Sequence, residues 1–227
     1  PPVSVRWLLA LAFIGVWSHP ALDWLNTYGM RWLMPMVNKW FYGDTLFIMD
    51  WIVWLTLLAG VIASHRRFGS NRRWYGRPAS WSLGFLLAYV IFNFNVTSLA
   101  ERKALGELQG EPPLRVLASP VPLNPLRREL VIEYPDRYHF ADYRLRGTPA
   151  ITMRTHSVSK GDAKDLRLVN ATRNGQWFLH WARFPYSISQ ITNGQRKITV
   201  ADARYVADVE NQRLDGFAVF EITLPAD

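Results

Sequence analysis

One short stretch of the chain combines side chains that could bind a metal ion. His19 and Asp23 are four residues apart, and Asn26 follows three residues later. On a helix this spacing places all three side chains on one face. An imidazole nitrogen and a carboxylate oxygen one turn apart can bind one divalent cation, but two ligands alone make a weak site. The spacing therefore allows a metal site without requiring one.

Asp50 is the third candidate ligand, because it is a lone carboxylate near the start of a second apolar run. A carboxylate in hydrocarbon costs about 2.5 to 3.5 kcal/mol on insertion scales, so it normally faces a partner or a cavity. Residues 26–45 would join the two runs in antiparallel fashion. This connection would bring Asp50 to the same depth as His19 and Asp23.

A second interpretation of these residues needs no metal. Asp23 would cap the end of its helix, with His19 as its partner. Asp50 would pair with Arg31 or Lys39 at the membrane interface. Spacing alone leaves the two interpretations open.

Three apolar segments must position these side chains: residues 7–25, 46–64 and 79–96. Each is close to the ~20 residues that an α-helix needs to cross hydrocarbon. Trp, Tyr and Arg flank them, which is typical of membrane spans rather than helices of a soluble core. We therefore expect three transmembrane helices. Asp44 should cap the second one, because an aspartate there accepts hydrogen bonds from free helix N–H groups.

The distribution of arginine predicts the topology. Five Arg among residues 65–77 mark this connection as cytoplasmic, and Arg6 before the first segment agrees. Residues 26–45 and everything after Ser98 should then lie outside the cytoplasm. We expect a multi-pass protein of a bacterial inner membrane with an extracytoplasmic, periplasmic C-terminal domain.

Composition differs between the two parts of the chain. Of the 18 acidic residues only Asp23, Asp44 and Asp50 precede Ser98, whereas nine of the eleven Trp do. The formal net charge of +8 comes largely from basic residues beside the apolar segments. Such residues set membrane topology, so we expect the lipid bilayer as a partner and no nucleic acid. The absence of Cys excludes disulfides and thiolate metal sites.

The C-terminal part predicts an α+β domain with a mainly antiparallel sheet. Residues 129–134 and 138–145 are β-rich runs that Pro135-Asp136-Arg137 would join as a hairpin. Helical patterns cover residues 162–184 with a break at Asn174-Gly175, and further strands are expected at 186–191, 196–201, 203–209 and 216–224. We divide the chain into a transmembrane domain with the His/Asp site (1–97), a helix and linker (98–126, with a short polar helix at 101–110) and an extracytoplasmic α+β domain (127–227).

Several short motifs occur in a fixed order in the first part of the chain. They are His19-Pro20-Ala21-Leu22-Asp23, Asn26-Thr27-Tyr28-Gly29, Pro35, Phe41-Tyr42-Gly43-Asp44 and Phe47-Ile48-Met49-Asp50. Through these motifs, residues 7–60 resemble the YdjM-like family of bacterial inner-membrane proteins, which are classed as metal-dependent hydrolases. The C-terminal part looks like an extension that some members carry, including residues 118–128 and 182–186.

The resemblance implies a divalent metal that activates water for hydrolysis. His19 and Asp23 would be metal ligands, and Asp50 would be a further ligand or the catalytic base. Members also carry an upstream His-Arg-Gly…Thr-His-Ser motif, which these 227 residues lack. We therefore expect either the C-terminal part of a member or an inactive protein. Thr155-His156-Ser157 does not replace the motif, because it lacks His-Arg-Gly and follows the His/Asp pair. Trp51 stands where the family has proline.

The sequence thus predicts an inner-membrane, metal-dependent hydrolase that acts on an unknown, lipid-linked substrate. A mixed set of His and carboxylate ligands favours zinc or manganese over magnesium. The alternative is a non-catalytic membrane anchor that presents its C-terminal domain to an envelope partner. The sequence indicates no oligomeric state.

Overall fold

The computed structural model describes residues 4–67, 76–108, 110–208, 213–214 and 218–225. By internal contacts the chain divides into two units. The first comprises residues 1–100 together with 119–128, and the second comprises residues 101–118 together with 129–227.

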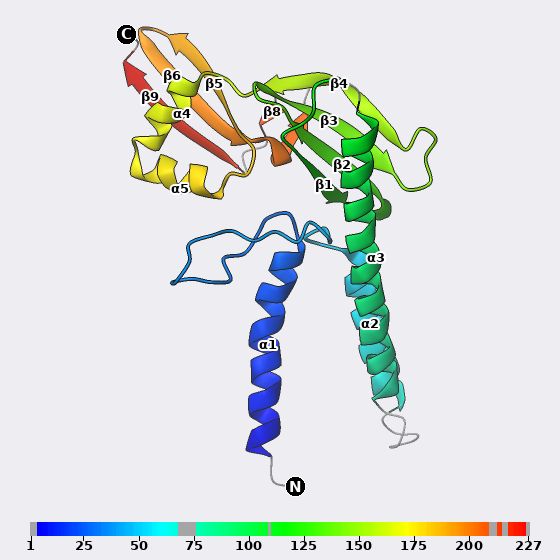
Figure 1. Cartoon of the computed structure of the whole chain (residues 1–227). Coiled ribbons are helices and arrows are strands. Elements are labelled where there is room, and N and C mark those ends of the chain that lie inside the picture. The colour runs from blue at the N-terminus through cyan, green and yellow to red at the C-terminus, as the bar shows by residue number, and fades with distance from the viewer. Residues whose placement is uncertain (1–3, 68–75, 109, 209–212, 215–217, 226–227) are drawn as a thin grey trace. The chain divides into compact units, whose positions relative to one another are not determined.

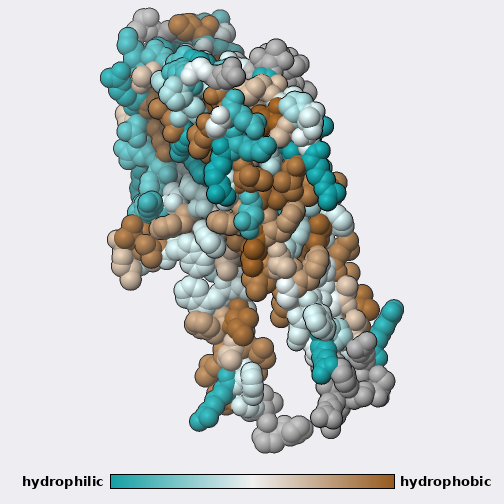
Figure 2. Space-filling model, turned by 45° about the vertical axis from the view of Figure 1, so that its right-hand side comes forward, coloured by the Kyte–Doolittle hydropathy of each residue, from teal (hydrophilic) through white to brown (hydrophobic). Residues whose placement is uncertain are grey.

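The first unit is built on three helices (Figure 1): α1 (Val5–Leu25), α2 (Trp51–Arg67) and most of α3 (Arg77–Glu107). No residue of α1 is buried, although the helix is rich in Leu, Trp and Phe. Figure 2 shows hydrophobic residues over the helices and hydrophilic residues gathered over the strand-rich part. A helix that is apolar on all its exposed faces needs an apolar solvent.

Helices α1 and α3 are long and apolar enough to cross a membrane, whereas the apolar helix Trp51–Arg66 is shorter. Of the three expected spans, two thus meet the criteria of length and composition. Helix α3 continues without a break from the third apolar segment through the polar helix expected at 101–110, and ends at Glu107. The connection 68–75, which carries part of the arginine cluster, lies outside the described residues.

The start of α2 corrects one prediction. Asp50, not Asp44, caps this helix: its Oδ1 accepts hydrogen bonds from the backbone N–H of Ile52 (2.9 Å) and Val53 (3.3 Å). Asp44 is buried and has φ of 49°.

The segment before α2 stays outside the helix because it is bonded to the end of α1. Gly43 N donates to Trp24 O at 2.7 Å, and the N–H groups of Thr45 and Leu46 both donate to Leu25 O. These bonds satisfy carbonyl groups that a helix C-terminus leaves free. The second helix therefore begins at Trp51, later than the apolar pattern predicted.

The remaining chain forms antiparallel sheets and two short helices, which confirms the α+β prediction. One sheet has the order β1 (Arg115–Val121), β2 (Asn124–Glu133), β3 (Arg137–Arg144), β4 (Ile151–Ser159), and a second has the order β5 (Pro185–Thr192), β6 (Gln195–Asp202), β9 (Val219–Pro225). A small pair joins β7 (Val206–Asp208) and β8 (Arg213–Leu214). The expected hairpin at Pro135 is confirmed as β2 and β3, while the stretch 98–126 contains the end of α3, all of β1 and the start of β2.

Both larger sheets contribute to one hydrophobic core in the second unit. Its buried members are Leu117, Val131, Tyr138, Phe140, Val158, Phe184, Tyr186, Ala201 and Ala203. A smaller cluster of Val169, Ile198 and Val200 joins the first short helix to β6.

The two short helices are α4 (Ala163–Asn170) and α5 (Arg173–Trp181). Asp162 caps α4 and Thr172 caps α5, where the hydroxyl of Thr172 accepts from Gly175 N at 3.0 Å. The break between the helices thus lies at residues 171–172 and not at Asn174-Gly175 as predicted. Gly175 is required in the first turn of α5 because a Cβ there would lie 2.0 Å from Val169 O.

Glu133 at the end of β2 gives the second unit a pH-dependent contribution to stability. Burial alone would raise the pKa of this carboxyl, but hydrogen bonds from Lys160 (2.7 Å) and Arg115 outweigh burial and hold the pKa below its ordinary value of 4.5. A lowered pKa in the folded state stabilises the fold above pH 4.5, and this contribution is lost as the pH falls further.

We expect Glu133→Gln to lower the free energy of unfolding by about 1 to 3 kcal/mol at pH 7, because charged hydrogen bonds are lost. The difference from the native protein should shrink as the pH falls below 4.5. Urea unfolding at pH 7 and pH 3.5 measures it. Glu129→Gln is the control, because its ion pair with Arg154 is about half exposed. An equal destabilisation at both pH values would contradict the prediction.

Candidate functional site

The predicted acids Asp23 and Asp50 line one cavity of about 150 Å³ in the first unit. The end of α1, residues 46–48 and the first turns of α2 form its walls. Its lining is Leu22, Asp23, Asn26, Leu46, Phe47, Ile48, Asp50, Val53, Trp54 and Leu57. Three polar side chains therefore share a cavity that is otherwise apolar.

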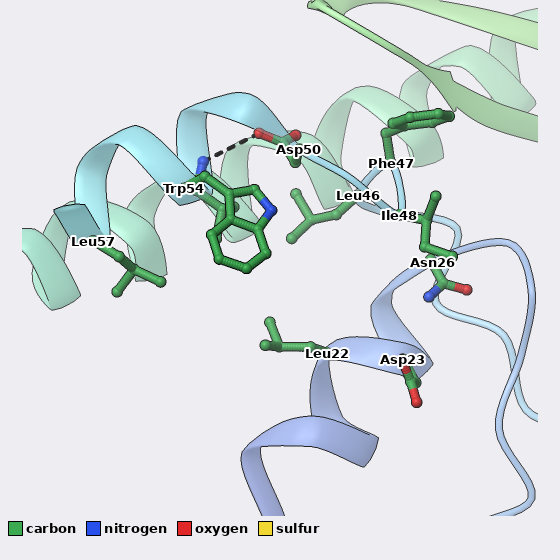
Figure 3. A pocket seen from close by; sticks show the side chains of 10 residues that line it. Leu22, Asp23, Asn26, Leu46, Phe47, Ile48, Asp50, Trp54 and Leu57 are labelled. Carbon is green, nitrogen blue, oxygen red and sulfur yellow. Dashed lines mark hydrogen bonds between the residues drawn. The ribbon is translucent and has the colours of Figure 1, made fainter. Parts of the chain in front are cut away.

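The two acids lie on opposite walls of this cavity (Figure 3). Asp50 projects from the start of α2 and Asp23 from α1, and the side chains of Leu22, Leu46 and Trp54 line the same cavity. The Asp23 carboxylate points away from Asp50. The helices thus bring both acids to one cavity without placing their oxygens against each other.

His19 and Asp23 form the local pair that their spacing predicted. His19 Nε2 lies 3.4 Å from Asp23 Oδ2, and both side chains come from the last turns of α1. The His19 side chain is 84% exposed and the Asp23 side chain 37% exposed. The pair could supply one nitrogen and one oxygen ligand to a cation on the exposed surface of α1.

Asp50 is held by hydrogen bonds on both carboxylate oxygens. Oδ1 accepts from the N-terminus of α2, and Oδ2 accepts from the hydroxyl of Tyr89 on α3 at 2.9 Å. Asp50 thereby satisfies N–H groups that the first turn of α2 would otherwise leave free. This arrangement replaces the pairing of Asp50 with Arg31 or Lys39 that the second interpretation expected. Arg31 instead bonds Asn38, and Lys39 lies over the Phe41 ring.

A line of polar groups continues from Tyr89 along α3. Asn93 Nδ2 donates to Tyr89 O, and Asn93 Oδ1 accepts from Arg128 Nη2 at 2.8 Å. Arg128 Nε donates to Thr97 Oγ1, whose hydroxyl donates to Asp44 O. Through these bonds the start of β2 and the segment before α2 are both attached to α3, whose Tyr89 donates a hydrogen bond to Asp50.

The residue set fits a two-ligand arrangement better than a complete metal centre. Among the described residues, no three His, Cys, Asp or Glu side chains lie close enough together to hold one ion. His19 and Asp23 are adjacent, while Asp50 shares only the cavity with Asp23. A metal at the His/Asp pair would therefore need further ligands.

Tyr89, Asn93 and Arg128 were not among the predicted site residues. Tyr89, Asn93 and Thr97 recur every four residues in an apolar helix, so they share one face, and this polar stripe was a readable signal. Arg128 carried no such signal, because its partners are far away in the sequence.

Two helices of this chain are long and apolar enough to cross a membrane. In agreement with this, residues 2–100 match the family model described as YdjM inner membrane protein. This region, which contains the whole cavity, is thus a YdjM-family region, and the resemblance noted from the sequence is confirmed. No curated protein and no solved structure matches the chain.

Proposed function

We propose that this inner-membrane protein is a metal-dependent hydrolase whose substrate enters the cavity between α1 and α2. The observation that carries the proposal is the cavity itself, in which Asp23, Asn26 and Asp50 stand in an otherwise apolar lining. An apolar cavity with a few polar groups is typical of ligand sites. Such a lining suits the apolar part of a lipid-linked or amphiphilic substrate.

His19 and Asp23 would hold the cation, and zinc or manganese suits a mixed His/carboxylate set. When bound, a divalent cation supplies Lewis-acid activation of water. The chain's own contribution is the orientation of Asp50, which the N-terminus of α2 and the Tyr89 hydroxyl fix in place. Asp50 would act as a further ligand or as the base that accepts a proton from water.

The proposal includes three membrane spans and an extracytoplasmic C-terminal domain. The support for α2 as a span is its apolar sequence and its basic end at His65-Arg66-Arg67. The basic ends of α1, α2 and α3 would share the cytoplasmic side by the positive-inside rule.

Metal analysis of the full chain purified from membranes tests this function. We expect His19→Ala and Asp23→Ala each to lower bound zinc or manganese at least tenfold, since each removes one of two adjacent ligands. The control is His180→Ala, because His180 is exposed on α5 in the other unit. Unchanged metal content in both test variants would overturn the proposal.

A second candidate function is a non-catalytic anchor for the C-terminal domain. The observation that favours it is the engagement of both Asp50 oxygens together with the incomplete ligand set in the described residues. The same experiment separates the two functions. An anchor should contain no stoichiometric metal, and its thermal stability should not respond to added zinc or manganese.

A further inference from the structure

Residues 30–41, here called the apolar loop, form a loop between α1 and α2 whose two ends are hydrogen-bonded to each other. Met30 and Phe41 exchange two backbone hydrogen bonds of 2.8 Å, which closes the loop at its neck. Gly29 precedes the neck with φ of +92°, and a Cβ there would lie 2.4 Å from the Tyr42 ring. In Figure 1 the loop belongs to the blue connection beside the upper end of α1. Its neck is therefore a defined structure that depends on glycine.

The tip of the apolar loop exposes large hydrophobic side chains. Met36 is 85% exposed, and Leu33, Met34 and Val37 are each 45–49% exposed. Large apolar side chains exposed next to one another along the chain are typical of a segment that contacts a protein or a membrane.

The base of the apolar loop carries positive charge and aromatic rings. No acidic residue occurs between Asp23 and Asp44, whereas Arg31 and Lys39 flank the tip. The Arg31 guanidinium lies 5.1 Å from the centre of the Trp40 ring, and Lys39 Nζ lies 5.8 Å from that of Phe41. Cations and rings beside an apolar tip are typical of segments that insert into the interface of an anionic bilayer.

Two contacts connect the loop region to the helices of spanning length. The Trp32 ring stacks on Trp17 of α1 at 6.0 Å between ring centres. Beyond the loop, Asp44 O accepts a hydrogen bond from Thr97 on α3 at 2.8 Å. Thr97 directly follows the apolar segment 79–96, so this attachment lies where the hydrocarbon-compatible surface ends. The segment that follows the loop is thus bonded to α3 at the end of its apolar run.

We propose that the apolar loop inserts its tip into the membrane interface and that Arg31 and Lys39 bind the phosphates of anionic lipids. The partner is the bilayer that surrounds the helices, rather than a second copy of the chain. This inference does not depend on metal binding or hydrolysis.

The chain lacks Cys, so one substitution gives one labelling site. A spin label at Met36→Cys in the full chain, reconstituted in vesicles of phosphatidylcholine with phosphatidylglycerol, reports its exposure to oxygen and to a water-soluble nickel chelate. Phe13→Cys on the exposed surface of α1 is the lipid reference. Ser189→Cys, exposed on β5, is the reference for a label on the strand-rich unit.

We expect the Met36 label to collide with oxygen more often than with nickel, as the Phe13 label does. Removing phosphatidylglycerol, or introducing Lys39→Gln, should raise nickel collisions, whereas Lys164→Gln on α4 should not. Nickel collisions as frequent as at Ser189, in both kinds of vesicle, would overturn the proposal. Spin–spin broadening between copies would also overturn it, because the tip would then contact a second chain.

Discussion

Replacing Asp202 with alanine should lower the free energy of unfolding of the second unit by about 3 to 5 kcal/mol. Asp202 and Arg204 form an ion pair of 2.9 Å whose side chains are 0% and 1% exposed. Asp202 also accepts hydrogen bonds from the backbone N–H of Arg183 (2.6 Å) and Phe184 (3.4 Å). The substitution would leave a buried guanidinium and three backbone donors, the third being the N–H of Arg204, without this acceptor, so its cost exceeds that of a surface pair.

Denaturant unfolding of the full chain in detergent, followed by the β-sheet circular dichroism signal, measures this loss. Glu221→Ala is the matched control, because its pair with Lys197 is about half exposed and should contribute less than about 1 kcal/mol. The double variant Asp202→Ala/Arg204→Met should recover part of the loss, since it removes the uncompensated charge. Equal effects of Asp202→Ala and Glu221→Ala would refute this account.

The fold could be predicted from sequence where the signal was local. Apolar length identified the helices, and alternation with turn residues identified the β2–β3 hairpin and the strands β5, β6 and β9. Strands β1 and β4 were not predicted, and the first part of the strand expected at 203–209 is a 3-10 helix, Ala203–Tyr205. The start of α2 could not be predicted in this way. Asp44 and Asp50 are both plausible caps by residue type, and the bonds from Gly43, Thr45 and Leu46 to the end of α1 decide between them.

In the candidate site, too, the contacts between neighbours in the sequence could be predicted and the long-range hydrogen bonds could not. The pair of His19 and Asp23 follows from helical spacing and forms as predicted. That Asp50 shares a cavity with Asp23 follows from the antiparallel connection of two helices. The hydrogen bond from Tyr89 required a third helix, and the role of Arg128 required a residue 35 positions beyond Asn93. Contacts of that kind depend on tertiary packing, which local spacing does not encode.

Replacing Arg128 with alanine should detach the start of β2 from α3 and cost about 3 to 5 kcal/mol of unfolding free energy. The Arg128 side chain is fully buried. It donates to Thr97 Oγ1 (3.0 Å) and to Asn93 Oδ1 (2.8 Å), and on its own strand to the carbonyls of Pro125 and Arg127. Alanine would leave these acceptors without their donor and would also leave a cavity.

Hydrogen exchange of residues 119–128, together with thermal unfolding in detergent, measures the effect. Amides in this segment should exchange faster in Arg128→Ala than in the native chain, because the segment loses its bonds to α3. Arg144→Ala is the control, since Arg144 is exposed at the end of β3. Unchanged exchange in residues 119–128 would show that other contacts hold this segment to α3.

The conservative variant Arg128→Lys separates charge from geometry. A lysine ammonium keeps the positive charge but lacks the planar fork that reaches Thr97, Asn93 and the strand carbonyls at once. We therefore expect Arg128→Lys to lose most of the stability that Arg128→Ala loses. Because Asn93 also bonds the carbonyl of Tyr89, both variants should loosen the Tyr89 bond to Asp50. Tyr89→Phe removes only the hydrogen bond from Tyr89 to Asp50, so it should leave the exchange of residues 119–128 unchanged. If Arg128→Lys kept full stability, the positive charge alone would account for the role of this residue.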